Sequence, residues 1–392
     1  MDTIPITRVS MGDEELAAVK QVLESGWLAQ GKQVAMFEER IAQLAACDHG
    51  VATTSCTTAL HLALAALGVG EGDEVIVPGF TWVSTANTVV FCGATPVFCD
   101  IDQDTYNLDT SLLEGLISPR TVGVIPVHLF GLCADMGAIQ KIADIHNIWV
   151  LEDAACGLGA TYGYKPAGSL GDAACFSFHP RKSVTMGEGG AVTTSDADLN
   201  QRLCVLRNHG ADPQAPRQAG QIMPEFTDIG FNYRLTDLQA AVGVVQLGRF
   251  PGFLAERRRL ASLYRQQLSS CEWLHLPEDG GDGWEHAYQS YVIGIRGDNM
   301  TLASITALRS QRNTLMELLE KEGIVTRPGT HAPVSLACHI EKWKLSPENF
   351  PQSLIAQATT IALPFYPGMG DHVIDRVSEV LLRSWNNLRE TI

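Results

Sequence analysis

The sequence predicts an α/β fold, in which a mainly parallel sheet carries helices on both faces and a smaller C-terminal α+β domain follows. The first observation behind this prediction is the alternation of short apolar runs with helix-length amphipathic stretches, the pattern of right-handed βαβ units. The second is the length of 392 residues, enough for two domains with substantial cores. The third is a break in helical periodicity at Phe250-Pro251-Gly252, which predicts a large domain over 1–248 and a small domain over 249–392.

The composition is that of an ordinary globular enzyme, with 18% charged and 45% hydrophobic residues. The formal charge of -16 and the lack of a Lys and Arg cluster argue against a nucleic-acid partner, because phosphate backbones need clustered positive charge. No uninterrupted apolar run reaches the ~18 residues of a membrane helix, so we expect no membrane partner. An anionic substrate must therefore be bound by hydrogen-bond donors that lie close to its site.

The cysteines and histidines predict a reduced protein without a metal. The ten cysteines are scattered singly, and the N-terminus lacks the basic and apolar regions of a signal peptide. We therefore expect a cytoplasmic protein with reduced thiols. The eleven histidines show no metal-ligand spacing such as His-Glu-x-x-His, so no metal is expected.

The N-terminal part of the chain is predicted to place hydroxyl groups at the start of a helix. The first predicted elements are a helix, a short strand and a second helix, over 13–24, 50–52 and 59–67. The second helix follows the hydroxyl-rich stretch 53–58, and its dipole and free N–H groups favour an anion there. Thr57 and Thr58 can add donors, so this is the expected cofactor-phosphate site. The alternative is that Ser55 or Thr57 only caps the helix.

The next patterns predict the parallel strands and the helices between them: strands over 74–78, 95–99, 122–127 and 148–151, and helices ending at 91 and spanning 135–146. Asp153 follows the last of these strands, at the edge where open α/β sheets bind ligands. A pyridoxal phosphate (PLP) enzyme needs such an acid, because a carboxylate keeps the pyridine nitrogen protonated and the ring electron-withdrawing. Alternatively, Asp153 only caps a helix that begins at Ala154.

Lys182 lies in a glycine-containing turn between two short apolar segments, 174–178 and 191–194. An amine held there can form a Schiff base with an aldehyde, although most turn lysines are only solvated. His179 and Arg181 flank the lysine, and both are more often structural than catalytic. A positive charge on Arg181 would favour the neutral, nucleophilic amine.

The C-terminal patterns predict a small mixed region. The predicted elements are helices over 236–247, 253–268, 304–322 and 371–388, and a strand over 288–295. The loop over 323–331 is predicted to reach the active site, where Arg327 and His331 are candidate substrate contacts.

Three stretches resemble the DegT-type family of PLP-dependent nucleotide-sugar aminotransferases, which have the fold-type I architecture. They are Lys182 with its Gly-Glu-Gly-Gly tail, Glu152-Asp153-Ala154-Ala155, and Gly230-Phe231-Asn232-Tyr233-Arg234, and the likeness covers nearly the whole chain. The resemblance implies PLP on the lysine, an amino-acid donor, a nucleotide-sugar substrate, and a homodimer with shared active sites.

The resemblance also implies roles for single residues. Trp82 matches an aromatic residue that stacks on the cofactor ring, and Ser177 matches a serine that donates to the cofactor phosphate. Asn232 matches an asparagine that reaches the phosphate of the neighbouring subunit. Cys156 replaces a larger polar residue that contacts the cofactor's phenolic oxygen, and Cys56 replaces a glycine. The alternatives are core packing for Trp82 and a bond of Asn232 to its own loop.

Two further residues are candidate substrate contacts. Trp27 belongs to a Ser-Gly-Trp segment that lines the active site in the family, and its alternative is core packing. Arg234 either neutralises an anionic substrate or pairs with a surface acid.

We therefore expect an aminotransferase that moves an amino group from an amino-acid donor, glutamate first, to the keto carbon of a nucleotide-linked sugar. Lys182 would act as general base and acid, and Asp153 would make the ring an electron sink. Amination of a free cyclic ketone such as an inosose is one alternative, and a PLP-binding regulator without turnover is another. A related sugar dehydratase carries histidine at the lysine position, so Lys182 argues against that activity.

Overall fold

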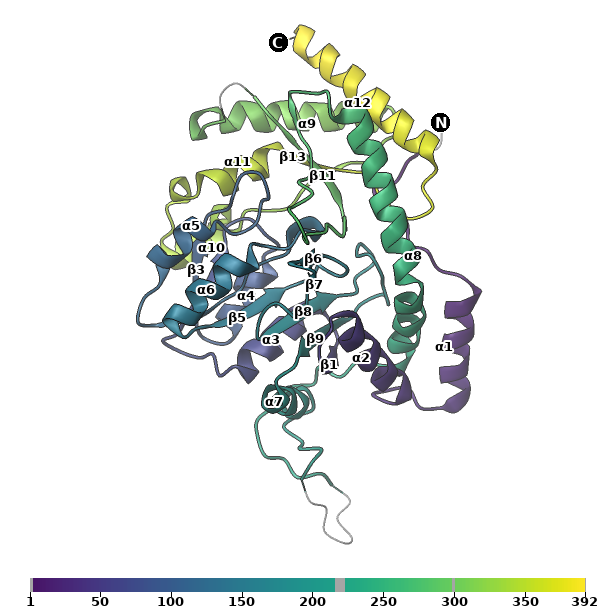
Figure 1. The fold of residues 1–392 in the computed structure, drawn as a ribbon, viewed down its shortest axis with the longest axis vertical. Helices are drawn as coiled ribbons and strands as arrows, with labels where there is room; N and C mark the ends of the chain where they lie inside the picture. The colour runs from purple at the N-terminus through teal and green to yellow at the C-terminus, as the bar shows by residue number, and fades with distance from the viewer. Residues whose placement is uncertain (1–2, 216–222, 298–299, 392) are drawn as a thin grey trace.

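The structure is a computed structural model of the chain and describes residues 3–215, 223–297 and 300–391. Figure 1 shows a large sheet surrounded by helices and a second, smaller sheet at one end of the molecule. Both chain ends lie at that end, near the last helix.

The large sheet has, within the described residues, seven strands in the order β1-β9-β8-β5-β4-β2-β3. Their bounds are β1 His49–Thr53, β2 Glu74–Pro78, β3 Thr95–Cys99, β4 Thr121–Val124, β5 Trp149–Asp153, β8 Ala173–Ser177 and β9 Gly190–Thr194. The neighbours from β3 to β8 pair in parallel, and β9 runs antiparallel to both β8 and β1. The predicted mainly parallel sheet is therefore confirmed.

Helices cover both faces of this sheet because alternate strand side chains enter different cores. Val75 and Val77 of β2 belong to one core, whereas Ile76 belongs to another. The helices on the first face are α3 (Cys56–Ala66), α4 (Ser84–Phe91) and α7 (Ala197–Arg207). Those on the second face are α2 (Lys32–Leu44), α5 (Thr110–Leu113), α6 (Met136–His146) and α8 (Asp237–Leu268), and α1 (Asp13–Ser25) packs on α8.

The smaller sheet is antiparallel and, in the part of the chain that the structure describes, has four strands in the order β10-β11-β13-β12. Its strands are β10 Leu274–His275, β11 Tyr291–Ile295, β12 Arg327–Pro328 and β13 Thr360–Leu363. The helices around it are α9 (Ile305–Lys321), α11 (Pro351–Thr359) and α12 (Asp371–Thr391). Helix α10 (Ala337–Trp343) instead packs against the large sheet's first core through Trp343. A separate hairpin consists of β6 (Thr161–Tyr162) and β7 (Lys165–Pro166). Short 3₁₀ turns are η1 Glu114–Leu116, η2 Leu129–Gly131, η3 Leu302–Ser304, η4 Pro333–Ser335 and η5 Pro347–Asn349.

The predicted helix break at Phe250-Pro251-Gly252 is wrong, because α8 continues through Pro251. A proline inside a helix costs about 3 kcal/mol, so other contacts must offset that loss. Phe250 is buried against Gly159, and the guanidinium of Arg249 donates to Glu15 at 2.7 Å. These contacts hold the helix before the proline, and the buried Arg257 and Leu260 hold it beyond the proline. Figure 1 shows α8 as the long helix at the right.

The predicted division into residues 1–248 and 249–392 stays a prediction. One hydrophobic core lies around the smaller sheet and draws on α8, α9 and α12, with Ile4 as its N-terminal member. The large sheet has its own cores on its two faces. This separation of cores supports two domains, with α8 passing from one to the other.

Two predicted strands are shorter in the structure. The strand predicted over 122–127 ends at Val124, and the strand predicted over 288–295 begins at Tyr291. Tyr288 has a positive φ of 47°, and the N–H groups of Ala287 and Ser290 donate to Gly131 and Phe130 instead of to a strand. The segment before β11 is therefore fastened to the large sheet's end.

Candidate active site

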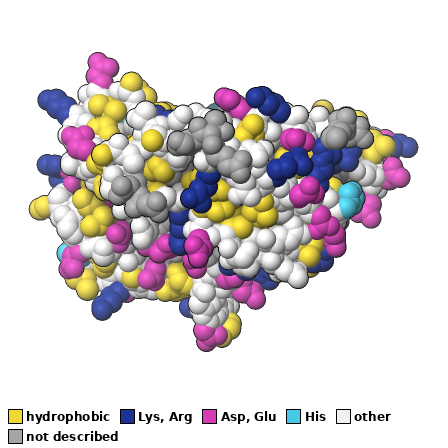
Figure 2. Space-filling model, turned by 90° about the horizontal axis from the view of Figure 1, so that it is seen from above, with side chains coloured by type: hydrophobic (Ala, Val, Ile, Leu, Met, Phe, Trp, Pro, Cys, Tyr) yellow, Lys and Arg dark blue, Asp and Glu magenta, His cyan; other side chains and the backbone are white. Residues whose placement is uncertain are grey.

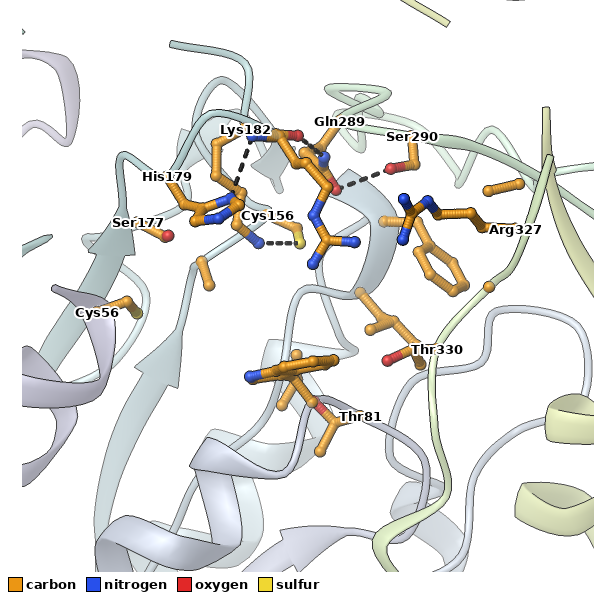
Figure 3. A pocket seen from close by; sticks show the side chains of 18 of the residues that line it. Cys56, Thr81, Cys156, Ser177, His179, Lys182, Gln289, Ser290, Arg327 and Thr330 are labelled. Atoms are coloured by element: carbon orange, nitrogen blue, oxygen red, sulfur yellow. Dashed lines mark hydrogen bonds between the residues drawn. The ribbon is translucent and has the colours of Figure 1, made fainter. Parts of the chain in front are cut away.

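A cavity of about 760 Å³ opens at the carboxyl ends of the parallel strands. Its walls include Asp153 at the end of β5, Ser177 at the end of β8, and Trp82 in the segment after β2. Parallel strands bring their following loops to one sheet edge, which explains why residues distant in sequence meet here. Figure 3 shows Lys182 and Cys156 among the side chains that project into this space.

Lys182 lies in the turn between β8 and β9, as predicted, and its backbone N–H donates to the His179 carbonyl at 2.8 Å. Its Nζ donates to Cys156 Sγ at 3.1 Å, the contact that Figure 3 marks beside the lysine. Burial lowers the pKa of the Lys182 amine, but Cys156, Cys56 and Asp153 together raise that pKa above its ordinary value.

Asp153 is 4% exposed and faces the cavity. Thr85 Oγ1 donates to its Oδ2 at 2.7 Å, and the backbone N–H of Ala155 donates to its Oδ1 at 3.2 Å. Burial raises the pKa of this carboxyl group, and the two donors and Lys182 oppose that effect. The structure therefore places a buried hydrogen-bond acceptor, held at both oxygens, in the cavity that contains the Lys182 amine.

Glu152 anchors the end of β5 from the opposite face of the strand. Its fully buried carboxylate accepts hydrogen bonds from the backbone N–H groups of Gly168, Leu170 and Gly171 at 2.7–2.9 Å. It also lies 2.8 Å from His128 Nε2. The backbone N–H of Ala134 donates to His128 Nδ1, so the ring proton sits on Nε2 and points to Glu152. This network fixes the strand end that carries Asp153. No sequence pattern predicted the network.

The N-terminus of α3 forms another wall, but it uses only part of the predicted hydroxyl cluster. Ser55, Cys56 and Thr57 line the cavity. Thr58 is not among the lining residues, because its hydroxyl lies 2.9 Å from the Ser55 N–H and 2.8 Å from the Ser55 carbonyl within a capping box. The expected donor role fits Thr57, whereas Ser55 and Thr58 form the cap.

Trp82 and the predicted active-site loop line the cavity. Trp82 is 51% exposed, so its indole is not part of the core, and its ring centroid lies 5.7 Å from that of His331. Arg327, Thr330 and His331 all line the cavity. In Figure 3 the Arg327 side chain extends from its strand towards the centre of the cavity.

Besides Thr58, three predicted site residues lie outside this cavity. Trp27 is 65% exposed, and Asn232 is exposed and forms a backbone bridge with Asn208. Arg234 donates to Asn208 Oδ1 at 2.6 Å, so neither an acid nor the cavity is its partner. A role of these residues at an active site would therefore require a second subunit.

Several residues that line the cavity were not predicted from the sequence, because no sequence pattern marks them. Gln289 and Ser290 enter it from the segment before β11, and Ile6 and Thr7 enter it from the N-terminal segment. Ile6 reaches the site because its carbonyl accepts from the Phe365 N–H at 3.0 Å. These positions depend on how the smaller sheet packs beside the large one.

The chemistry of this cavity fits PLP. The α3 N-terminus with Thr57, together with Ser177, provides donors for a phosphate. Trp82 presents an exposed aromatic face to a flat ring, Asp153 offers a buried acceptor to a ring N–H, and Lys182 supplies the amine. No group of three His, Cys, Asp or Glu side chains suited to a metal ion occurs in residues 3–215, 223–297 and 300–391. Over the same residues, no helix is both long and apolar enough to cross a membrane.

Comparison with known proteins agrees with the predicted family. Residues 9–382 match the DegT/DnrJ/EryC1/StrS aminotransferase family. The spore coat polysaccharide biosynthesis protein SpsC of Bacillus subtilis (strain 168) is 37% identical over 382 residues, 96% of this chain and 96% of that protein. GDP-perosamine synthase of Caulobacter vibrioides is 37% identical over 380 residues, 96% of this chain and 97% of that enzyme.

A solved structure agrees with the predicted architecture and cofactor. The PLP form of Spr1654 from Streptococcus pneumoniae matches with a TM-score of 0.90 at 26% identity, over 98% of this chain and 99% of that chain. The predicted fold-type I architecture is therefore confirmed. The chain is a PLP-dependent enzyme that belongs to the DegT/DnrJ/EryC1/StrS aminotransferase family.

Proposed function

We propose that this aminotransferase moves an amino group from an amino-acid donor, glutamate first, to the keto carbon of a nucleotide-linked sugar. The family makes the chain a PLP-dependent sugar aminotransferase, and the likeness to GDP-perosamine synthase supports a nucleotide-linked acceptor. The observation that carries the proposal is the meeting of Lys182 and Asp153 in one cavity that also offers phosphate donors.

Each residue has a defined task in this proposal. PLP bound here would supply an electron-withdrawing ring that stabilises negative charge on the carbon that loses a proton. Asp153 would accept the ring N–H and so keep that proton in place. The amine of Lys182 would bind the cofactor's aldehyde carbon, and once displaced it would move the proton from the donor's α-carbon. Trp82 would hold the ring plane, and Thr57 and Ser177 would hold the phosphate.

A homodimer with shared active sites is the second part of the proposal. Asn232 is exposed and lies outside its own cavity, which leaves its amide able to reach a neighbouring subunit. Trp27 and Arg234 also lie outside that cavity, and Trp27 exposes a large apolar surface. We retain the cytoplasm as the expected compartment, in agreement with ten cysteines that form no disulfides.

The test starts with protein loaded with pyridoxamine phosphate, the amino form of the cofactor. The loaded protein is mixed either with nucleotide-linked ketosugars that differ in base and sugar, or with free inososes. We expect the absorbance of the aldehyde form to return only with nucleotide-linked ketosugars, and mass spectrometry to show an aminated sugar. Lys182→Ala, loaded in the same way, is the matched control, because it lacks the amine but keeps the rest of the cavity.

The outcomes separate the proposal from its alternatives. Conversion of free inososes without conversion of any nucleotide-linked ketosugar would favour the cyclic-ketone alternative. A cofactor-binding protein that converts no ketone and accepts no amino group from any amino acid would be the regulator without turnover.

A further inference from the structure

Positive charge gathers in the active-site cavity although the molecule as a whole is acidic. Three cationic side chains line the cavity, those of Arg181, Lys182 and Arg327, against two acidic ones, those of Asp153 and Glu188. The chain carries a formal charge of -16. In Figure 2 acidic side chains are spread over the face in view, with Lys and Arg between them. A cavity of opposite sign attracts anions that the rest of the surface repels.

Two of these cations have no carboxylate partner. Within the described residues, neither Arg181 nor Arg327 forms an ion pair, and neither guanidinium donates to another side chain. Other arginines of this acidic chain do find such partners, as Arg207 does with Glu38. Unpaired guanidinium groups beside a cavity are available to an anionic ligand, and they bind carboxylate or phosphate with two parallel hydrogen bonds.

The backbone of Arg181 is fixed although its side chain is free. The Gln289 amide Nε2 donates to the Arg181 carbonyl at 2.6 Å, and the backbone N–H of Arg181 donates to His179 Nδ1 at 3.2 Å. Gln289 is only 8% exposed, and Ser290 Oγ donates to its Oε1 at 3.0 Å, which orients the amide (Figure 3). A side chain from the segment before β11 thus holds the turn that carries both Arg181 and Lys182.

We propose that Arg181 recognises the anionic oxygen group of the substrate and that Gln289 positions Arg181 for this task. The inference rests on the proposed function and names the residue that meets the substrate's charge. Arg181 directly precedes Lys182, so their Cα atoms are about 3.8 Å apart. The reacting amine and the anion-binding guanidinium therefore belong to one rigid turn, and Arg327 provides a second cation from β12.

The anionic group has two possible sources in an aminotransferase. One is the carboxylate of the amino-acid donor, and the other is the diphosphate of the nucleotide-linked sugar. The two substrates use the same cavity in turn, so one guanidinium can serve either or both. The experiment measures the two half-reactions separately, which identifies the source.

The central variant is Arg181→Gln, compared with Arg181→Lys and with Arg309→Gln as the matched control. Arg309 is exposed on α9 and is not among the residues that line the cavity. We expect Arg181→Gln to raise KM for the donor, the nucleotide-linked ketosugar or both by about 10- to 150-fold, the range of one hydrogen bond to a charged group. We expect a much smaller change in kcat, partial recovery with lysine, and unchanged kinetics in Arg309→Gln.

Binding measurements extend the test beyond turnover. Calorimetry of the cofactor-loaded protein with glutarate, a dicarboxylate without an amine, reports the carboxylate source, and inorganic pyrophosphate reports the diphosphate source. Arg181→Gln should weaken glutarate binding if it impairs the donor half-reaction, and pyrophosphate binding if it impairs the half-reaction with the nucleotide-linked sugar. The affinity for PLP should not change, because the proposal assigns the cofactor phosphate to other residues.

Gln289 is tested by a double-mutant cycle. Gln289→Leu should raise the same KM that Arg181→Gln raises, and it should add little in the Arg181→Gln background, because both changes remove one interaction. If Gln289→Leu raises KM by the same factor in the Arg181→Gln background as in the wild type, the role of Gln289 is merely structural. Unchanged KM values and probe affinities in folded Arg181→Gln, or a loss confined to PLP affinity, would overturn the assignment of Arg181. The half-reaction with the amino-acid donor needs no sugar. Failure of the Arg181 assignment can therefore be distinguished from failure of the proposed nucleotide-linked acceptor.

Discussion

Thr85→Val should move the acid limb of the pH–activity profile to higher pH. Thr85 is fully buried in α4, and its Oγ1 lies 2.7 Å from Asp153 Oδ2 but 3.2 Å from the Trp82 carbonyl. The hydroxyl has one proton, so the shorter contact with the carboxylate takes it. Valine keeps the β-branched shape and removes this donor, which leaves Asp153 with the Ala155 N–H.

The size of this effect follows from the strength of the lost bond. A hydrogen bond to a charged group contributes about 1.5–3 kcal/mol. At 1.36 kcal/mol per pKa unit, the acid limb should therefore rise by about one to two pH units. The sign is upward, because the Thr85 donor lowers the pKa of the Asp153 carboxyl group and its loss adds to the raising effect of burial.

The assay is kcat/KM for the amino donor between pH 5 and 9, measured on cofactor-loaded protein. Thr85→Ser is the matched control, because serine retains the hydroxyl and should keep the acid limb within a few tenths of a pH unit of the wild type. Circular dichroism and cofactor occupancy would establish that the valine variant is folded and loaded. An acid limb at the wild-type position in such a protein would refute the view that Asp153 must be ionised and that Thr85 keeps it so.

Three further perturbations test the site and its assembly. Lys182→Ala should abolish the absorbance band of lysine-bound cofactor and stop turnover, whereas borohydride fixation of the wild-type cofactor on another lysine would contradict this. Asp237→Ala should destabilise the protein by about 1.5–3 kcal/mol, since its carboxylate accepts three backbone N–H bonds at the start of α2; an unchanged thermal midpoint would contradict that. Asn232→Ala should weaken PLP binding roughly 10- to 150-fold, and mixing it with Lys182→Ala should restore some activity. Mixed dimers that demonstrably form, as followed by mass-tagged subunits, and stay inactive would exclude a site shared in this way.

Short-range sequence patterns were enough to predict the local framework of the site. Strands β2 and β3 have the predicted bounds, and Asp153 ends a strand as the apolar run before it indicated. Lys182 lies in the predicted turn between two strands. These features are local, because the alternation of buried side chains and the glycines of a turn are written into a few consecutive residues.

Which side chains meet around the cavity depends on the packing of elements that are far apart in the sequence. Thr85 and Asp153 are 68 residues apart, and Gln289 and the Arg181 carbonyl are 108 residues apart. Asp237 lies in the first turn of its own helix, yet its carboxylate also caps α2 from 206 residues away. Polar contacts of this kind leave no periodic signal, because they arise from the packing of finished elements. The same packing carried α8 through Pro251, where the local propensity for a break was outweighed by burial on both sides.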